Sequence, residues 1–323
     1  MSGKWHVTPH TEPDSPRDSW PRQRGFDEFF GTLPGHGSFW DPKGLMRNNE
    51  PARPGKGFFY TDAIADHAVK FVEMAGNRPL FLYVAFTAPH DPRQPPTEHR
   101  EAYYAKQPPL PPDFLPQHPF DNGYVCNLRD ESLAAWPRTE AVIRDQLAEY
   151  YGMITHLDEQ VGRVLEALAR SPHAEHTYVV YASDHGLALG SHGLLGKQSL
   201  YEHSMRCPLI VRGPGVPAGR ETTAFTYLHD LFPTVCTLAG VELPEGIDGR
   251  DLAPLWRGER EAIRASVFLP FTDTMRSVRD ARWKLIRYPP IGHTQLFDLT
   301  ADPHETRNLA EEPRHTAEVA RLT

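Results

Sequence analysis

The sequence predicts an α/β fold, in which a mostly parallel β-sheet carries helices on both faces and a small antiparallel sheet follows towards the C-terminus. Two observations predict this class. Segments with apolar side chains at helical spacing alternate with short, wholly apolar runs, which is typical of parallel strands buried between helices. After about Trp256 the apolar runs become short and closely spaced, with turn residues between them, which indicates antiparallel strands.

The segments of the larger part follow one another along the chain. Residues 60–75 and 139–169 show the apolar periodicity of amphipathic helices, and Pro172 ends the second of them. The other segments are three buried strands and one helix interrupted at Pro233, over 80–86, 177–182, 208–212 and 227–239. The smaller part contains four short strands and a final helix, over 267–270, 275–278, 283–288, 295–299 and 311–322. This change predicts a domain boundary between residues 255 and 256.

Composition narrows the class of protein. The chain has 323 residues, and its 34 Lys and Arg against 42 Asp and Glu give a net charge of −8. A chain of this length buries a sizeable core without disulfides. The mild acidity speaks against a nucleic-acid partner, whose phosphates need a basic face. No apolar run approaches the roughly 20 residues of a membrane span, and three cysteines are too few for a disulfide framework.

Proline is the unusual residue, with 32 in the chain. Eleven of them lie between Pro89 and Pro137, which predicts a long, rigid loop over residues 92–137. Disorder is the competing interpretation, and the aromatic side chains interleaved with these prolines argue against it.

Polar residues follow two of the predicted strands, at the edge where open α/β sheets bind their ligands. His90 follows the first strand, and Asp184 and His185 follow the second after Ser183. A carboxylate beside an imidazole can bind a divalent metal ion. The alternative is an Asp that caps the next turn and a His on the surface.

Two further segments offer positive charge. The Gly-rich loop (residues 186–197) can fold tightly against a ligand, and it carries His192 and Lys197. Near the start of the chain, Lys4 and His6 are two residues apart, so an extended backbone would place both on one side. Solvent-exposed side chains are the alternative for this pair.

Taken together, these motifs resemble the sulfatase family of the alkaline-phosphatase superfamily. They occur in the family's order, as GKWH at 3–6, RGFDEFFG at 24–31, APH at 88–90, SDHG at 183–186, HG at 192–193 and GK at 196–197. The segments 282–288, 296–299 and 302–309 look like the family's C-terminal subdomain. The resemblance implies an alkaline-phosphatase-like fold with a catalytic domain over 1–255, a substrate loop over 92–137 and a C-terminal subdomain over 256–323.

The resemblance also implies roles for single residues. Lys4, His90 and Lys197 match the positions that bind the sulfate oxygens, and His6 matches the histidine that contacts the nucleophile. His90 or Lys197 could hand a proton to the leaving oxygen. Two metal-ligand positions are matched by Asp184 and His185. The implied metal is Ca²⁺, although the imidazole nitrogen leaves Mn²⁺ and Zn²⁺ open.

Family members attack with a formylglycine, made from the Cys or Ser of a Cys/Ser-x-Pro-x-Arg motif. None of Cys126, Cys207 and Cys236 is followed by the required Pro and Arg, and Ser19 fails because Gln23 stands where the Arg belongs. The family's adjacent pair of metal-binding aspartates is absent too. We therefore expect the N-terminal strand, the metal pair and the nucleophile to be missing from this chain, either because it is a truncated fragment of a longer protein or because it is a degraded copy. Any signal peptide would belong to the same missing segment, so the compartment stays open. The chain alone is then expected to be inactive.

The expected substrate is a small-molecule or carbohydrate sulfate ester, and the oligomeric state stays open. The sequence does not indicate whether the substrate is an aryl sulfate, a carbohydrate sulfate or choline sulfate. A phosphodiester or phosphonate monoester hydrolase of the same superfamily is the nearest alternative, because it handles a similar tetrahedral anion. A non-catalytic protein that binds sulfated glycans through Lys4, Lys197 and the Pro-rich loop is the alternative from another class.

Overall fold

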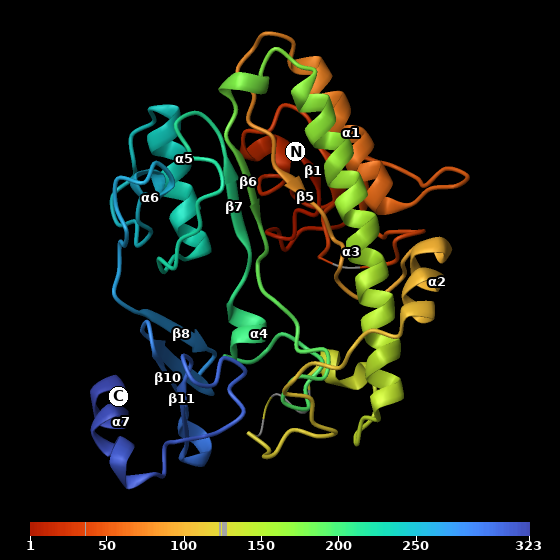
Figure 1. The fold of residues 1–323 in the computed structure, drawn as a ribbon. Coiled ribbons are helices and arrows are strands. Elements are labelled where there is room, and N and C mark those ends of the chain that lie inside the picture. Colours follow the sequence, from red (N-terminus) through yellow and green to blue (C-terminus); the bar gives the residue numbers. More distant parts are fainter. Residues whose placement is uncertain (36, 123, 125–127) are drawn as a thin grey trace. The chain divides into compact units, whose positions relative to one another are not determined.

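The computed structural model of the chain describes residues 1–35, 37–122, 124 and 128–323. They divide into two compact units, each of which we describe by itself (Figure 1). Unit 1 comprises Met1–Pro109 and Arg144–Thr177, and unit 2 comprises Leu110–Ile143 and Tyr178–Thr323. The boundary expected between residues 255 and 256 lies inside unit 2 and stays a prediction.

Unit 1 is built on a five-stranded sheet with the strand order β4-β3-β2-β1-β5. Its strands are β1 (Ser2–Gly3), β2 (Phe30–Thr32), β3 (Leu45–Arg47), β4 (Glu50–Pro51) and β5 (Val84–Ala85). β1 pairs in parallel with both β2 and β5, whereas β3 is antiparallel to β2 and to β4. The three strands β2, β1 and β5 therefore form the parallel part of the sheet, and their carboxyl ends lie at one edge.

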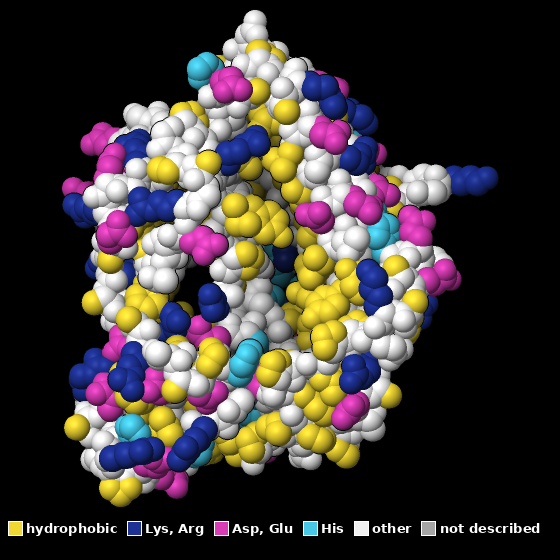
Figure 2. Space-filling view, in the orientation of Figure 1, with side chains coloured by type: hydrophobic (Ala, Val, Ile, Leu, Met, Phe, Trp, Pro, Cys, Tyr) yellow, Lys and Arg dark blue, Asp and Glu magenta, His cyan; other side chains and the backbone are white. Residues whose placement is uncertain are grey.

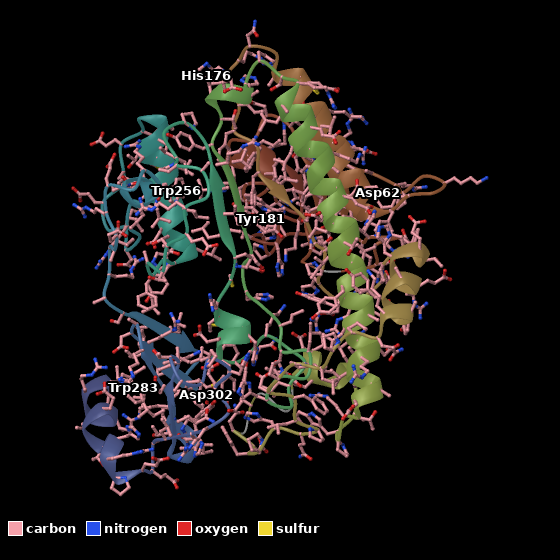
Figure 3. The ribbon with its side chains drawn as sticks, in the orientation of Figure 1. Asp62, His176, Tyr181, Trp256, Trp283 and Asp302 are labelled. Atoms are coloured by element: carbon pink, nitrogen blue, oxygen red, sulfur yellow. The ribbon has the colours of Figure 1, made fainter. Side chains whose placement is uncertain are left out.

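The helices of this part are α1 (Tyr60–Ala75), α2 (Thr97–Lys106) and α3 (Glu140–Ala169), with short 3₁₀ helices η1 (Pro21–Arg24) and η4 (Ala174–His176). The boundary between the units falls within α3, after Ile143. Figures 1 and 3 show α1 beside α3, and Asp62 on α1 lies 2.8 Å from Nε2 of His156 on α3. The predicted ranges of these two long helices are confirmed, because their apolar stripes are continuous over whole turns.

Side chains of the sheet in unit 1 alternate between two clusters. Phe30 and Leu45 pack with Ile64 of α1 and Leu157 of α3. Phe29 and Met46, the neighbours of these two residues in the sequence, point to the other face and pack around Trp20. Both faces of this short sheet are thereby covered.

Unit 2 begins with a two-stranded antiparallel sheet of β6 (Val179–Ala182) and β7 (Leu209–Arg212). Its helical segments are η3 (Arg129–Leu133), α4 (Glu202–Met205), η5 (Leu228–Asp230), α5 (Leu231–Ala239) and α6 (Ala253–Trp256). One face of the two strands packs against α5 and α6 around Trp256. On the other face, Tyr181, labelled in Figure 3, is 41% exposed and its cross-strand partner Ile210 is 63% exposed. The prediction that both strands are wholly buried is therefore wrong for one face.

The rest of unit 2 contains the predicted antiparallel sheet, with the order β11-β10-β9-β8. Its elements are β8 (Val267–Phe271), β9 (Met275–Arg279), β10 (Trp283–Tyr288), β11 (His293–Asp298), the 3₁₀ helices η6 (Pro289–Ile291) and η7 (Pro313–His315), and α7 (Thr316–Leu322). Figure 2 shows acidic and basic side chains interspersed over this part. Ion pairs such as Arg282–Asp298 and Arg321–Asp280 account for that mixture.

The predicted α/β class with a C-terminal antiparallel sheet is confirmed, and two segments differ from expectation. The apolar run 80–86 forms only the two-residue strand β5, and Phe81 and Tyr83 are 66% and 50% exposed, because β5 is the last strand in the order of its sheet. The Pro-rich segment 92–137 is ordered into α2 and η3 over part of its length. Within the described residues, no helix combines the length and apolarity needed to cross a bilayer.

Candidate functional site

Lys4 and His90 follow neighbouring parallel strands of unit 1. Lys4 comes directly after β1, His90 lies five residues after β5, and the two strands pair with Gly3 opposite Ala85. Both residues therefore lie beyond carboxyl ends of the sheet, where α/β proteins bind ligands.

The close approach of β1 and β5 depends on Gly3. Its φ is +115°, and a Cβ at this position would lie 2.0 Å from the carbonyl oxygen of Ala85. The next amide, that of Lys4, donates a hydrogen bond of 2.8 Å to the same oxygen. Glycine at this position thus lets β5 hold the backbone of Lys4 in place.

His6 departs from the extended geometry that the sequence suggested. β1 ends at Gly3, and His6 has a φ of 57°, in the left-handed region. Its ring packs on Gly35, where a Cβ would come within 2.3 Å of the imidazole. The expectation that one extended strand carries both Lys4 and His6 is therefore wrong, because β1 ends at Gly3 and the backbone of His6 is left-handed.

His90 has a fixed tautomer. Its Nδ1 lies 2.7 Å from the carbonyl oxygen of Asp91, and its amide donates to the carbonyl of Thr87 in a tight turn. Because a carbonyl oxygen only accepts, Nδ1 carries the proton. Nε2 is therefore the atom at which His90 can gain or lose a proton.

In unit 2, Asp184 and His185 are the second and third residues after β6, and their side chains lie together. Oδ2 of Asp184 is 3.4 Å from Nε2 of His185, while Nδ1 of His185 contacts the carbonyl oxygen of Gly186 at 3.0 Å. A metal-binding histidine commonly donates its second ring N–H to such a carbonyl. The pair thus fits a divalent cation with one oxygen and one nitrogen donor. The described residues contain no cluster of three such donors.

Cys207 lies near this pair and is a poor nucleophile. Burial raises the pKa of its thiol, and the negative charge of Asp184 raises it further. Since the thiolate is the reactive form, Cys207 is less reactive at neutral pH than an ordinary exposed thiol. Cys126 lies outside the described residues.

The Gly-rich loop closes on its own backbone. The amide of Ala188 donates to the carbonyl of Gly196 at 2.9 Å, and that of Gly190 donates to Leu194 at 2.7 Å. Gly193, with a φ of +71°, approaches so closely that a Cβ would lie 2.2 Å from the backbone of Gln117. The tight folding expected from the glycines is present, and at Gly193 it packs the loop against the protein's own chain.

His192 belongs to the core of unit 2, where it is 7% exposed. Its ring stacks on Tyr201 at 3.9 Å, Nε2 contacts the carbonyl oxygen of Glu305 at 3.0 Å, and Nδ1 lies 3.1 Å from a carboxylate oxygen of Asp113. The suggestion that His192 offers charge to a ligand is therefore wrong. Lys197, at the end of the loop, is half-buried.

Two buried histidines beside this loop predict an acid sensitivity. Burial lowers the pKa of His203 to about 3 and that of His118 to about 4, from 6.5. Below pH 6.5 the unfolded chain binds protons that the folded chain does not. The free energy of unfolding is therefore highest above pH 6.5. Below that pH it falls by about 1.4 kcal/mol per pH unit for each histidine, until the pH reaches the pKa of that histidine in the folded chain.

Urea unfolding at pH 7.5, 6 and 5 measures this effect, with His203→Gln as the comparison. The variant cannot titrate at this position, so its stability should fall less steeply with acid. Equal slopes for both proteins would contradict the assignment.

One residue that contacts the Gly-rich loop, Glu131, could not be predicted from the sequence. Its carboxylate accepts hydrogen bonds from the amides of Leu195 and Gly196, which lie 64 and 65 residues further along the chain. Glu131 stands in the Pro-rich segment among other polar residues, and no local spacing connects it with residues so far away. Only a tertiary structure could find this contact.

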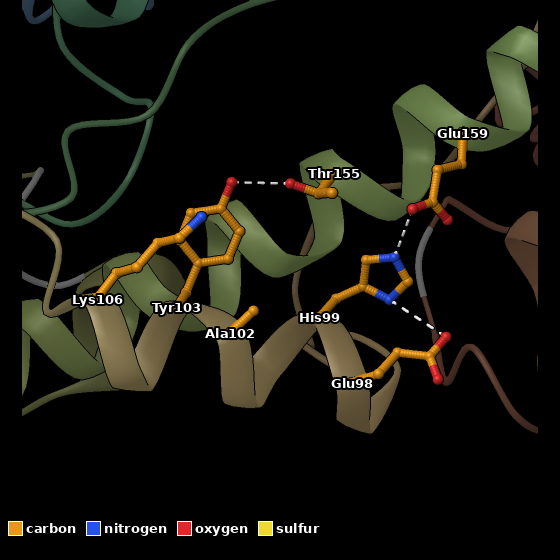
Figure 4. A pocket seen from close by; sticks show the side chains of 7 residues that line it. All are labelled: Glu98, His99, Ala102, Tyr103, Lys106, Thr155 and Glu159. Atoms are coloured by element: carbon orange, nitrogen blue, oxygen red, sulfur yellow. Dashed lines mark hydrogen bonds and ion pairs between the residues drawn. The ribbon is translucent and has the colours of Figure 1, made fainter.

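A surface pocket of about 300 Å³ lies between α2 and α3 in unit 1 (Figure 4). It is lined by Glu98, His99, Ala102, Tyr103, Lys106, Thr155 and Glu159. Nε2 of His99 lies 2.9 Å from Glu159, and the hydroxyl groups of Tyr103 and Thr155 are 2.8 Å apart. None of the residues predicted from the sequence as site residues lines this pocket.

Comparison with protein families gives two matches. The model of the Sulfatase family matches residues 1–241, and that of the C-terminal part of N-sulphoglucosamine sulphohydrolase matches residues 190–323. Together they extend over the whole chain.

Curated relatives agree with these families. The chain is 30% identical to the multifunctional alkaline phosphatase superfamily protein PehA of Trinickia caryophylli, over 92% of this chain and 64% of that protein. It is 33% identical to a choline-sulfatase of Rhizobium meliloti, over 76% of this chain and 49% of that protein. The chain thus spans about half to two thirds of the length of these relatives.

Solved structures share the fold. One, a complex with its substrate D-glucosamine-2-N,6-O-disulfate, matches with a TM-score of 0.80 and 23% identity, covering 100% of this chain and 77% of its own. A phosphonate monoester hydrolase of Silicibacter pomeroyi matches with a TM-score of 0.72 and 27% identity, over 94% of this chain and 67% of its own.

Proposed function

Because the chain belongs to the sulfatase family, we propose that it acts in the hydrolysis of sulfate monoesters, with Lys4, His90 and Lys197 binding the sulfate oxygens. The observation that carries the proposal is the match of residues 1–241 to this family, in a chain whose Lys4 and His90 follow the parallel strands β1 and β5. Fixed cations suit this reaction because the oxygen of the leaving group gains negative charge as the S–O bond breaks.

Each of these side chains has a task in the reaction. Lys4 and Lys197 are ammonium groups that neutralise the sulfate, and His90 can transfer a proton to the leaving oxygen from Nε2, since Nδ1 is engaged with Asp91. The match of His6 to the family motif supports a role for it beside the nucleophile. Asp184 and His185 would hold a divalent cation, for which Ca²⁺, Mn²⁺ and Zn²⁺ are candidates. Such a cation would add positive charge opposite the sulfate, and a formylglycine would supply the attacking hydroxyl.

No Cys/Ser-x-Pro-x-Arg motif occurs in the 323 residues. We therefore expect these 323 residues by themselves not to turn over p-nitrophenyl sulfate, and the activity is to be tested in the natural gene product. Metal-dependent turnover by the 323-residue chain alone would contradict this part of the proposal.

Phosphonate monoester hydrolysis is the second candidate, and the structural match to the hydrolase of Silicibacter pomeroyi favours it. The deciding experiment compares an aryl sulfate, a phosphodiester and a phosphonate monoester as substrates of the natural gene product. A higher kcat/KM for the sulfate supports the proposed function. A preference for the phosphonate supports the second candidate, and binding of sulfated glycans without any turnover would overturn both.

A further inference from the structure

The backbone in front of Lys197 is held by a buried carboxylate of unit 2. The side chain of Glu131 is 2% exposed. Its carboxylate accepts the amide of Leu195 at 3.1 Å from both oxygens and the amide of Gly196 at 2.9 Å. Two consecutive amides are thus fixed by one charge, immediately before the residue that is proposed to bind sulfate.

Arg138 completes this arrangement. Its side chain is fully buried, and its Nη2 lies 2.8 Å from Oε2 of Glu131. Its Nη1 donates a hydrogen bond of 2.7 Å to the carbonyl oxygen of Gly193. The guanidinium therefore balances the charge of Glu131 and also holds a second point of the Gly-rich loop.

The third amide is held as well. The amide of Lys197 donates to Oε1 of Gln198 at 3.2 Å, and Nε2 of Gln198 donates to Asp130 at 3.1 Å. Burial raises the pKa of Asp130, but hydrogen bonds from Arg129 and Gln198 and the charge of Lys197 hold it below its usual value. Asp130 and Glu131, neighbours in η3, thus connect to three successive amides.

We propose that Glu131, together with Arg138, is a positioning residue, whose carboxylate fixes the amides of Leu195 and Gly196 and thereby sets the place of the Lys197 ammonium group. The inference rests on the proposed function, because the position of Lys197 matters only if Lys197 binds the sulfate. Glu131 itself does not contact the substrate. A hydrogen-bonded charge that is buried holds its partners more rigidly than an exposed one, because water does not compete for them.

The test uses Glu131→Gln, which keeps the shape of the side chain but replaces one acceptor oxygen by a donor. Asp230→Asn is the matched control. Asp230 is equally buried, pairs with Arg264 at 2.6 Å and accepts the amides of Tyr227 and Arg250, all within unit 2. Both substitutions should lower stability, but only the first should affect the loop.

Hydrogen exchange of the 323-residue chain directly measures how strongly Glu131 holds the amides of Leu195 and Gly196. We expect the amides of Leu195 and Gly196 to exchange about 10- to 100-fold faster in Glu131→Gln, and unchanged relative to their neighbours in Asp230→Asn. In the natural gene product, Glu131→Gln should also raise the inhibition constant of inorganic sulfate about 10-fold, towards the value of Lys197→Ala. Unchanged exchange at both amides would overturn the proposal.

Two other results would also overturn it and differ in meaning. If exchange accelerates while sulfate inhibition stays constant, and Lys197→Ala does weaken inhibition, the contact is structural only. If Lys197→Ala itself leaves inhibition unchanged, the proposed function of Lys197 fails first.

Should Glu131→Gln not fold, Gly196→Ala replaces it. A Cβ at Gly196 would lie 2.7 Å from Oε1 of Gln198 and would displace the same segment without removing a charge. It should weaken sulfate inhibition too, and no change would refute positioning by this segment.

Discussion

Replacing Lys197 by alanine in the natural gene product is expected to lower kcat/KM for a sulfate monoester about 10²- to 10³-fold. The ammonium group stands at the end of a loop in which Glu131 accepts the amide of Gly196 and Gln198 accepts the amide of Lys197 itself. Its charge is therefore preorganised towards the anion, and water that replaces it must reorganise in each turnover. Steady-state kinetics with p-nitrophenyl sulfate measures the loss.

Two further variants sharpen this prediction. Lys70→Ala removes an exposed lysine of α1 and should leave kcat/KM unchanged. Lys197→Arg keeps the charge but spreads it over a planar fork, so we expect an intermediate loss. If Lys197→Ala retained activity within about threefold of the natural protein, well below the loss of one fixed donor, Lys197 would not bind the sulfate.

The second large effect concerns stability. Lys284 is fully buried in β10, and its Nζ lies 2.8 Å from Glu305 and 3.1 Å from Glu202. Lys284→Ala leaves the buried carboxylate of Glu305 without its cation, so the free energy of unfolding should fall by about 3–5 kcal/mol. Urea unfolding at pH 7.5 measures this loss.

The control for this experiment is an exposed pair. Arg170 and Glu166 are 3.6 Å apart and both 71% exposed, so Arg170→Ala should change stability by less than about 1 kcal/mol. The double variant Lys284→Met and Glu305→Gln should lose less than Lys284→Ala, because it leaves no unpaired charge. A loss for Lys284→Ala as small as that for Arg170→Ala would show that the cluster is not energetically coupled.

The cluster around Lys284 also bears on the Gly-rich loop. The carbonyl of Glu305 contacts His192, and its carboxylate accepts the amide of Glu202. The C-terminal sheet and the loop that carries Lys197 thus share one buried polar network within unit 2. Glu131 contacts the Gly-rich loop from a segment before it in the sequence, whereas Glu305 contacts it from a segment after it. Destabilising the network around Glu305 should therefore also loosen the loop.

Much of the fold could be predicted from local patterns. The apolar stripe predicted α1 over its full length and α3 to within one residue, and alternation with turn residues predicted β8 to β11. These patterns work because a helix or an exposed antiparallel strand shows its buried face in its own sequence. Strand burial in β5, β6 and β7 was not predictable in this way, since an apolar run does not tell which side a neighbour covers.

For the candidate site, too, some features follow from the sequence and others only from the tertiary structure. The sequence by itself determined the order of the motifs, and from that order Lys4, His90, Asp184, His185 and Lys197 are proposed as site residues. Only the tertiary structure decided how they are held: the left-handed turn at His6, the burial of His192, and the grip of Glu131 on residues 195 and 196. The physical reason is that a backbone amide has no sequence signature, so the carboxylate that binds it can lie anywhere along the chain.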